Sequence, residues 1–116
     1  MKKPFLLLAI LPLIGFAALT MPSSQAEGES LQIIKFEADW CGPCQQMKPI
    51  FKKISDKYSS GVAFQSVNVD SQASLADRFN VEGLPTVVAV KDGREVGRHV
   101  GFMSAWKLNS FVRKHR

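Results

Sequence analysis

The sequence predicts a single α/β domain whose mixed four-stranded sheet is flanked by helices, in the chain order βαβαββα. Short apolar runs rich in β-branched residues alternate with stretches in which apolar residues recur every three or four positions. This alternation is typical of parallel strands joined by helical crossovers. An Asp-Gly pair at positions 92–93 indicates a hairpin, which adds antiparallel strands to the same sheet. The length of 116 residues fits one such domain.

Residues 1–26 have the pattern of a secretory signal peptide. A short basic start precedes an almost unbroken apolar run at 5–19, and small residues then lead to a cleavage site after Ala26. The run is 15 residues long, which is shorter than the roughly twenty residues that a membrane-spanning helix needs. We therefore expect residues 27–116 to form an exported domain, periplasmic in a Gram-negative source. An uncleaved membrane anchor is the alternative.

The first predicted strand and the helix after it lie on either side of the cysteine pair. Residues 31–38 form a short apolar run, and the next helix is expected to begin at Cys44. Apolar residues recur on its inner face at helical spacing, at Met47, Ile50, Phe51, Ile54 and Tyr58. Pro49 is expected to kink this helix because proline lacks a backbone donor and clashes with the preceding turn. The helix is expected to end by Gly61.

The middle of the chain predicts a second strand and a short helix. The strand covers 62–69, and Asp70 and Ser71 are residue types that favour a helix start. The inner face of that helix holds Leu75, Ala76 and Phe79. Residues 81–85 are expected to form a loop.

The last third of the chain predicts a hairpin and a closing helix. The β-branched run 86–90 is a third strand, and the Asp-Gly turn leads into a fourth strand at 95–100. Gly97 and Gly101 indicate bulges or a close approach of the backbone in that strand. Ser104 is expected to cap the final helix, whose inner face holds Leu108, Phe111 and Val112.

The charge pattern does not favour nucleic-acid binding. The formal net charge is +5, but lysines and arginines are interspersed with acidic residues along most of the chain. Only the tail 113–116 is a basic cluster, and a helix end that complements the helix dipole explains it more simply.

The two cysteines are the expected site of the chemistry. Because the loop between Cys41 and Cys44 is so short, a purely structural disulfide would stabilise the fold little. A zinc site needs about four ligands, and the chain offers only these cysteines and two distant histidines, so no metal is expected. Cys41 falls where a strand gives way to a helix, and unpaired N–H groups and the helix dipole favour its thiolate there. We expect Cys41 to attack a substrate disulfide and Cys44 to resolve the mixed disulfide, while Gly42 and Pro43 keep the sulfurs close.

The stretch from Ile33 to Arg116 resembles the thioredoxin family. The resemblance is carried by Phe36 to Cys44 (which contains Trp-Cys-Gly-Pro-Cys), Pro49, Asn68-Val69-Asp70, Gly83-Leu84-Pro85-Thr86, Lys91-Asp92-Gly93 and Gly101. It implies a minimal thioredoxin fold that lacks the family's first strand and helix, with strand 62–69 at an open edge of the sheet. It also implies a redox-active disulfide between Cys41 and Cys44, with no other cofactor.

The resemblance assigns roles to the residues around the cysteines. In the family the proline that matches Pro85 is cis and lies against the cysteines. The backbone of Gly83 and Leu84 is then implied to pair with an extended substrate segment. Trp40 is implied to flank the sulfur of Cys41. An ordinary turn proline and a tryptophan that only packs on the surface are the alternatives.

One departure from the family pattern concerns the charge beneath the cysteines. The family has a buried acid where this chain has Lys35, its lysine partner corresponds to Ser66, and its second tryptophan corresponds to Glu37. Lys35 and Glu37 share a strand face because they are two residues apart. Our hypothesis is that they form an ion pair in which Glu37 transfers a proton and Lys35 stabilises the thiolate of Cys44. The alternative is that Lys35 extends to solvent.

We expect a protein-disulfide oxidoreductase that acts on protein thiols and disulfides and contributes to redox homeostasis outside the cytosol. The Gly-Pro pair between the cysteines resembles that of reducing family members, and such a reductant would take electrons from a membrane thiol carrier. We expect a monomer that binds no nucleic acid. A thiol oxidant in the same compartment and a non-catalytic binding module are the alternatives.

Overall fold

A computed structural model of the chain describes residues 30–116. The expected signal peptide, residues 1–26, and its cleavage site lie outside the described residues and stay predictions. The described part contains four strands, β1 (Leu31–Glu37), β2 (Val62–Asn68), β3 (Thr86–Lys91) and β4 (Arg94–Val100). It also contains three helices, α1 (Gly42–Lys57), α2 (Ala73–Arg78) and α3 (Ala105–His115). None of these three helices combines the length and the apolar character needed to cross a membrane.

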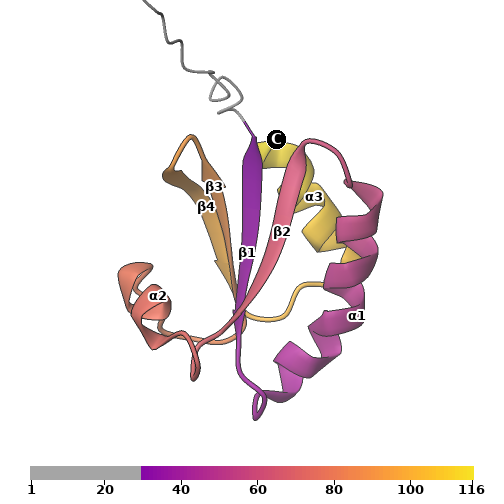
Figure 1. Cartoon of the computed structure of the whole chain (residues 1–116). Coiled ribbons are helices and arrows are strands. Elements are labelled where there is room, and N and C mark those ends of the chain that lie inside the picture. The colour runs from indigo at the N-terminus through magenta and orange to yellow at the C-terminus, as the bar shows by residue number, and fades with distance from the viewer. Residues whose placement is uncertain (1–29) are drawn as a thin grey trace, which may run out of the picture.

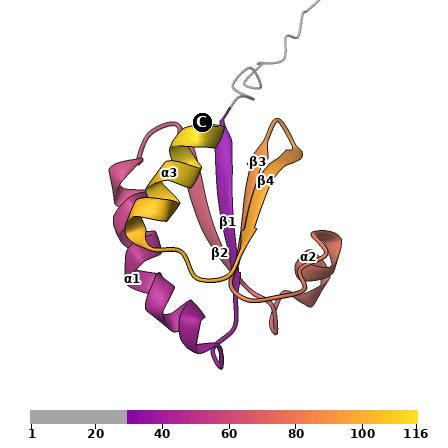
Figure 2. The ribbon, with the colours of Figure 1, turned by 180° about the vertical axis from the view of Figure 1, so that it is seen from behind.

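The strands form one mixed sheet in the order β2-β1-β3-β4 (Figure 1). β1 is parallel to β2 and antiparallel to β3, and β3 is antiparallel to β4. Helices α1 and α3 cover one face of the sheet, whereas α2 lies on the other side (Figure 2). The predicted mixed four-stranded α/β architecture is therefore confirmed, and β2 lies at an edge of the sheet as expected.

The central strands separate two apolar clusters. On the face covered by α1 and α3, buried side chains of β1 and β3 pack against buried side chains of both helices. The strands contribute Leu31, Ile33 and Val87, and the helices contribute Met47, Phe51, Leu108 and Val112. On the other face a smaller cluster gathers beneath α2; its buried members are Ile34, Phe36, Val67, Ala76, Val88 and Val90. β1 is buried over most of its length because it carries neighbours on both edges and both faces.

Helix α1 begins earlier than its apolar pattern suggests. It starts at Gly42 with proline in its first turn, two residues before the predicted start at Cys44. Proline is suited to this position because the first N–H groups of a helix have no partner within the helix. α1 is a single helix of 16 residues that includes Pro49. Both cysteines thus belong to its N-terminal turn.

Helix α2 begins later than predicted. The sequence places its start at Asp70 and Ser71, but the helix runs only from Ala73 to Arg78. The side-chain oxygen of Asn68 accepts hydrogen bonds from the N–H groups of Asp70 (2.8 Å) and Ser71 (3.2 Å). This local turn uses the donors that would otherwise open the helix, so the expected cap at residues 70–71 is wrong.

The hairpin and the final helix follow the sequence pattern. Asp92 and Gly93 both have positive φ, at 55° and 78°, as the tightest hairpin turns require. Ala89 pairs with Gly97 and Val90 with Glu95, so one residue of β4 bulges out next to Gly97. The Ser104 side chain accepts a hydrogen bond from the N–H of residue 107 at 3.2 Å and caps α3 as predicted.

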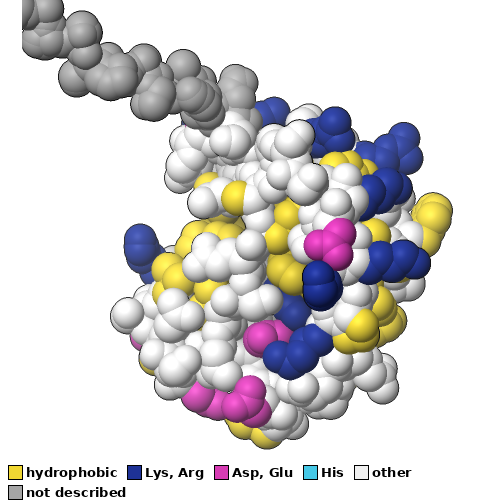
Figure 3. All heavy atoms as spheres, turned by 45° about the vertical axis from the view of Figure 1, so that its right-hand side comes forward, with side chains coloured by type: hydrophobic (Ala, Val, Ile, Leu, Met, Phe, Trp, Pro, Cys, Tyr) yellow, Lys and Arg dark blue, Asp and Glu magenta, His cyan; other side chains and the backbone are white. Residues whose placement is uncertain are grey.

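Charged side chains of both signs are interspersed on the face that carries α1 (Figure 3). Dark-blue lysine and arginine side chains gather mainly in the upper and right-hand part of this view, and magenta acidic side chains lie among and below them. The face therefore carries no uniform field of one sign.

Candidate active site

Cys41 occupies the N-cap position of α1. Its backbone is extended, with φ −93° and ψ 111°, and its Sγ accepts a hydrogen bond from the N–H of Cys44 at 3.2 Å. A disulfide joins the two cysteines. Cys41 is 6% exposed and Cys44 is fully buried. Only Cys41 therefore presents its sulfur towards the surface, at a helix end whose N–H groups stabilise negative charge.

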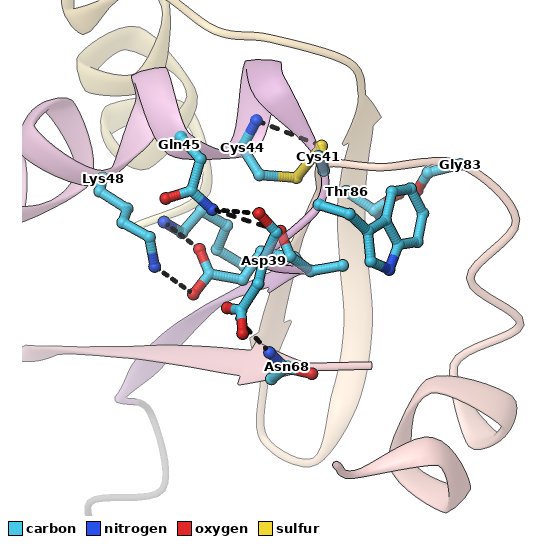
Figure 4. The surroundings of a disulfide bond; sticks show 12 residues. Asp39, Cys41, Cys44, Gln45, Lys48, Asn68, Gly83 and Thr86 are labelled. Atoms are coloured by element: carbon cyan, nitrogen blue, oxygen red, sulfur yellow. Dashed lines mark hydrogen bonds and ion pairs between the residues drawn. A yellow bond between two sulfur atoms is a disulfide. The ribbon is translucent and has the colours of Figure 1, made fainter. Parts of the chain in front are cut away.

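The loop before β3 lies beside the cysteines (Figure 4). The Leu84–Pro85 peptide bond is cis, as the resemblance implied. The Thr86 hydroxyl donates a hydrogen bond to the carbonyl of Gly83 at 2.6 Å, and the N–H of Gly101 donates to the carbonyl of Pro85 at 2.7 Å. These bonds fix the loop from both ends.

The helix start and this loop enclose a groove of about 520 Å³. It is lined by Trp40, Cys41, Gly42, Pro43, Val69, Val81, Glu82, Gly83 and Leu84. The structure thus brings six of the sequence-predicted site residues to one surface. Cys44 and Pro85 are buried and do not line this groove. Within residues 30–116 the backbone of Leu84 makes no backbone hydrogen bond, so its N–H and carbonyl remain available to a ligand in the groove.

Trp40 forms an exposed wall of the groove. Its side chain is 71% exposed, and its indole N–H donates a hydrogen bond to Oδ2 of Asp70 at 3.0 Å. This contact orients the ring from the β2–α2 connection. The sequence places Asp70 at a helix start and in a motif shared with the family, but this orienting role was not predicted. The signal that could have found it is a carboxylate directly after the strand that neighbours β1.

Three charged side chains meet beneath α1, and we call Lys35, Glu37 and Lys48 the charge cluster. Lys35 Nζ lies 2.8 Å from Glu37 Oε1, and Lys48 Nζ lies 3.1 Å from Glu37 Oε2. The side chain of Lys35 is 1% exposed, and its ammonium sits 4.8 Å from the centre of the Phe51 ring. The alternative in which Lys35 extends to solvent is therefore wrong.

Lys48 is a member of the cluster that the sequence analysis missed. It lies on α1 four residues after Cys44, and it reaches back to the carboxylate at the end of β1 (Figure 4). Residues at this spacing share a helix face. Its position one helical turn after the buried Cys44 is the feature of the sequence that could have indicated its place in the cluster.

The carboxyl of Glu37 is held in its charged form. Burial raises its pKa. The hydrogen bonds and the positive charges of Lys35 and Lys48 lower it by more, so the pKa falls below its ordinary value of 4.5. Glu37 is therefore a carboxylate at neutral pH. The charge cluster then carries two positive charges and one negative charge.

A metal ion would need several ligating side chains close together. In the part of the chain from 30 to 116, no group of three or more His, Cys, Asp or Glu side chains is placed to hold a metal ion.

The comparisons with known proteins agree with this geometry. The Thioredoxin family profile matches residues 23–114. Thioredoxin of Mycoplasma pneumoniae is 42% identical over 80 residues, which cover 69% of this chain and 78% of that protein. Thioredoxin H2-1 of rice is 46% identical over 71 residues, which cover 61% of this chain and 51% of that protein. The chain thus spans about half the length of the rice relative and more than two thirds of the bacterial one.

Solved structures extend the similarity to the arrangement of the elements. Fasciola hepatica thioredoxin superposes with a TM-score of 0.73 at 32% identity, covering 79% of this chain and 86% of that one. A reduced Schistosoma mansoni thioredoxin pre-protein superposes with a TM-score of 0.71 at 35% identity, covering 79% of this chain and 85% of that one. With its cysteine pair at the N-terminus of α1 beside a cis-proline loop, the chain belongs to the thioredoxin family of thiol–disulfide oxidoreductases.

Proposed function

We propose that the protein reduces disulfides of other proteins outside the cytosol, with Cys41 as the attacking residue and Cys44 as the resolving residue. The observation that carries this assignment is the different exposure of the two sulfurs. Cys41 caps α1 and lines the groove, whereas Cys44 is fully buried one turn deeper. A substrate disulfide can therefore reach Cys41 first.

The reaction starts from the reduced protein and transfers two electrons. The thiolate of Cys41 attacks one sulfur of the substrate disulfide, which forms a mixed disulfide and releases the other substrate sulfur as a thiolate. Cys44 then loses its proton and attacks Cys41 Sγ, which closes the Cys41–Cys44 disulfide and releases the second substrate thiolate. The substrate is reduced and the protein is oxidised.

The groove provides the surface for the substrate. An extended segment can pair with the unpaired backbone of Leu84, next to Gly83, in the manner of an added strand. Trp40 and Pro43 give this segment apolar contacts on the side of the helix. Backbone pairing depends little on side chains, so this mode suits a range of protein substrates.

The compartment and the electron donor follow from the N-terminal pattern. The expected signal peptide at residues 1–26 supports an exported, periplasmic protein, which stays membrane-anchored if the segment is not cleaved. A reductant in that compartment needs electrons from a membrane thiol carrier. We propose that it acts as a monomer, with its disulfide as its only redox group. A thiol oxidant is the second candidate because Lys35, which can stabilise the reduced form, stands where the family has an acid.

Insulin reduction by dithiothreitol tests the activity. We expect the wild-type protein to accelerate insulin precipitation and Cys41→Ser to abolish the acceleration, because the attacking thiolate is lost. Trp106→Ala is a matched control, since Trp106 is exposed but lies outside the groove. A wild-type protein that does not accelerate the reaction would be a binding module.

A trapping experiment tests the order of the two cysteines. Cys44→Ser should accumulate a mixed disulfide between Cys41 and the substrate, seen as a mass shift that reductant removes. Cys41→Ser should accumulate much less. Equal trapping by both variants would contradict the assignment.

The reduction potential decides the direction of electron flow. A potential nearer to about −270 mV than to about −120 mV supports the reductant, and the reverse supports the oxidant. Equilibration with glutathione buffers, followed by alkylation of free thiols, measures it.

A further inference from the structure

The charge cluster beneath α1 has a net charge of one positive unit, formed by Lys35, Lys48 and the Glu37 carboxylate. We propose that this net charge stabilises the thiolate of the reduced active site, and that Lys48 and Lys35 thereby set the equilibrium between the dithiol and the disulfide. Glu37 holds the two ammonium groups in place and does not transfer the proton. The inference rests on the proposed disulfide exchange and assigns the residues that tune it.

The cluster is connected to the cysteines through α1 and β1. Lys48 follows Cys44 by four residues on α1, and side chains at this spacing are neighbours, with Cβ atoms about 5–6 Å apart. Glu37 is the last residue of β1, and the next residue, Ala38, packs against both cysteines. The charges are therefore held by α1, which carries Cys44, and by β1, which leads to Cys41, and Figure 4 shows Lys48 on the same helix as Cys44.

Burial keeps the field of the cluster strong. Lys35 is 1% exposed and the Glu37 side chain 10%, so water screens them little. Lys48 is 46% exposed, and its contribution is correspondingly smaller. A surface hollow beside α1 is lined by all three residues of the charge cluster. It is also lined by Lys52, which pairs with Asp56 at 3.2 Å. Asp39, beside the site, is exposed to solvent.

Glu37 is a poor candidate for proton transfer. Its pKa lies below 4.5, so the group stays ionised at neutral pH and has no proton to donate. As a base it is weak, because an efficient general base has a pKa near the working pH. Both of its oxygens already face ammonium groups. This differs from our sequence-based hypothesis, in which Glu37 transferred the proton.

The consequence is an effect on a measurable equilibrium. In the exchange with glutathione, the protein disulfide and two glutathione thiols give the protein dithiol and one glutathione disulfide. A positive charge near the cysteines stabilises the thiolate that the reduced protein forms. Removing a positive charge should therefore shift the equilibrium towards the protein disulfide.

Two single variants test the effect of charge. Lys35→Met and Lys48→Met each make the cluster neutral. We expect Lys35→Met to lower the equilibrium constant for reduction by about tenfold and Lys48→Met, whose charge is partly screened by water, by about threefold. Alkylation of Cys41 should show a raised thiol pKa in both. Lys48→Arg should restore the wild-type behaviour, and Lys52→Met is the control that removes an α1 lysine outside the cluster. Lys48 is half-exposed, so its variant keeps the test valid if Lys35→Met does not fold.

A charge-matched double variant separates the charge from the carboxylate. Lys35→Met with Glu37→Gln removes one positive and one negative charge and leaves the net charge at one positive unit. We expect its equilibrium constant and its thiol pKa to stay within about twofold and about 0.3 units of wild type. A double variant with a strongly slowed resolution step would instead show that Glu37 transfers the proton.

The outcomes distinguish this inference from the proposed function. A wild-type protein that does not reduce insulin overturns the proposed function. An active wild-type protein whose Lys35→Met and Lys48→Met variants match the Lys52→Met control overturns the inference alone.

Discussion

At the scale of single residues, the site is governed by how charge is held next to sulfur. The sulfur of Cys41 accepts a hydrogen bond from an N–H group of its own helix, and the Glu37 carboxylate forms ion pairs with two ammonium groups. A buried carboxylate without such partners would be costly, and so would a buried ammonium. Glu37 and Lys35 are therefore each tolerated because of the other. This mutual dependence has a pH signature.

Acid should weaken the fold through Glu37. Its pKa in the folded protein lies below the ordinary 4.5, so its contribution to stability is present above that value and is lost as the pH falls through the folded pKa. At neutral pH, Glu37→Gln should cost about 3 kcal/mol of the free energy of unfolding. Urea unfolding should show this difference shrinking below about pH 4.5. Glu95→Gln, which breaks an exposed pair with Arg98, should cost less than about 1 kcal/mol.

The residues of the site differ in how far the sequence predicts them. The ion pair of Lys35 and Glu37 follows from the two-residue repeat of a strand, which fixes their common face. The contact of Lys48 does not follow from such a rule, because it depends on how α1 is rotated above the sheet. The hydrogen bond from Trp40 to Asp70 likewise joins residues 30 positions apart.

At the scale of elements, capping side chains determine the residue at which each helix begins. α1 begins at Gly42 because Cys41 caps it, and α3 begins at Ala105 because Ser104 caps it. The second cap is a local sequence signal and was predicted. The start of α2 was predicted two to three residues too early, because the Asn68 side chain captures the N–H groups of the preceding turn. Competition between nearby polar side chains for the same donors is what the sequence pattern could not resolve.

Removing the cap of α3 should weaken the protein measurably. Ser104→Ala leaves the N–H of Lys107 without its side-chain acceptor, and we expect a loss of about 1 kcal/mol in the free energy of unfolding. Ser110→Ala is the control, because Ser110 lies inside the same helix, where alanine is the better helix former. Urea denaturation followed by circular dichroism measures both. A cost for Ser110→Ala equal to that for Ser104→Ala would contradict the role of the cap.

At the scale of the whole molecule, the sheet separates two apolar clusters that differ in how well helices cover them. The face beneath α1 and α3 holds fully buried side chains from both helices and both central strands. The other face is covered by α2, a helix of 6 residues with one buried residue. The sequence predicted the helices and strands, but it did not show which face of the sheet each helix would cover or which face would be the better packed. That difference follows from the lengths of the covering helices.

This difference in covering predicts that core substitutions on the two faces lower the free energy of unfolding by different amounts. Leu108 on α3 is fully buried, so Leu108→Ala should leave a cavity and cost about 3 kcal/mol of the free energy of unfolding. Leu75 on α2 is only partly buried at the edge of the smaller cluster, so Leu75→Ala should cost about 1 kcal/mol. Domains have a total stability of about 5–15 kcal/mol, so the first loss is a large share of the whole. Urea unfolding of the oxidised variants gives both values, with an unchanged m-value showing that the unfolding transition is the same. Equal losses, or a larger loss for Leu75→Ala, would mean that the face beneath α2 contributes as much to stability as the face beneath α1 and α3.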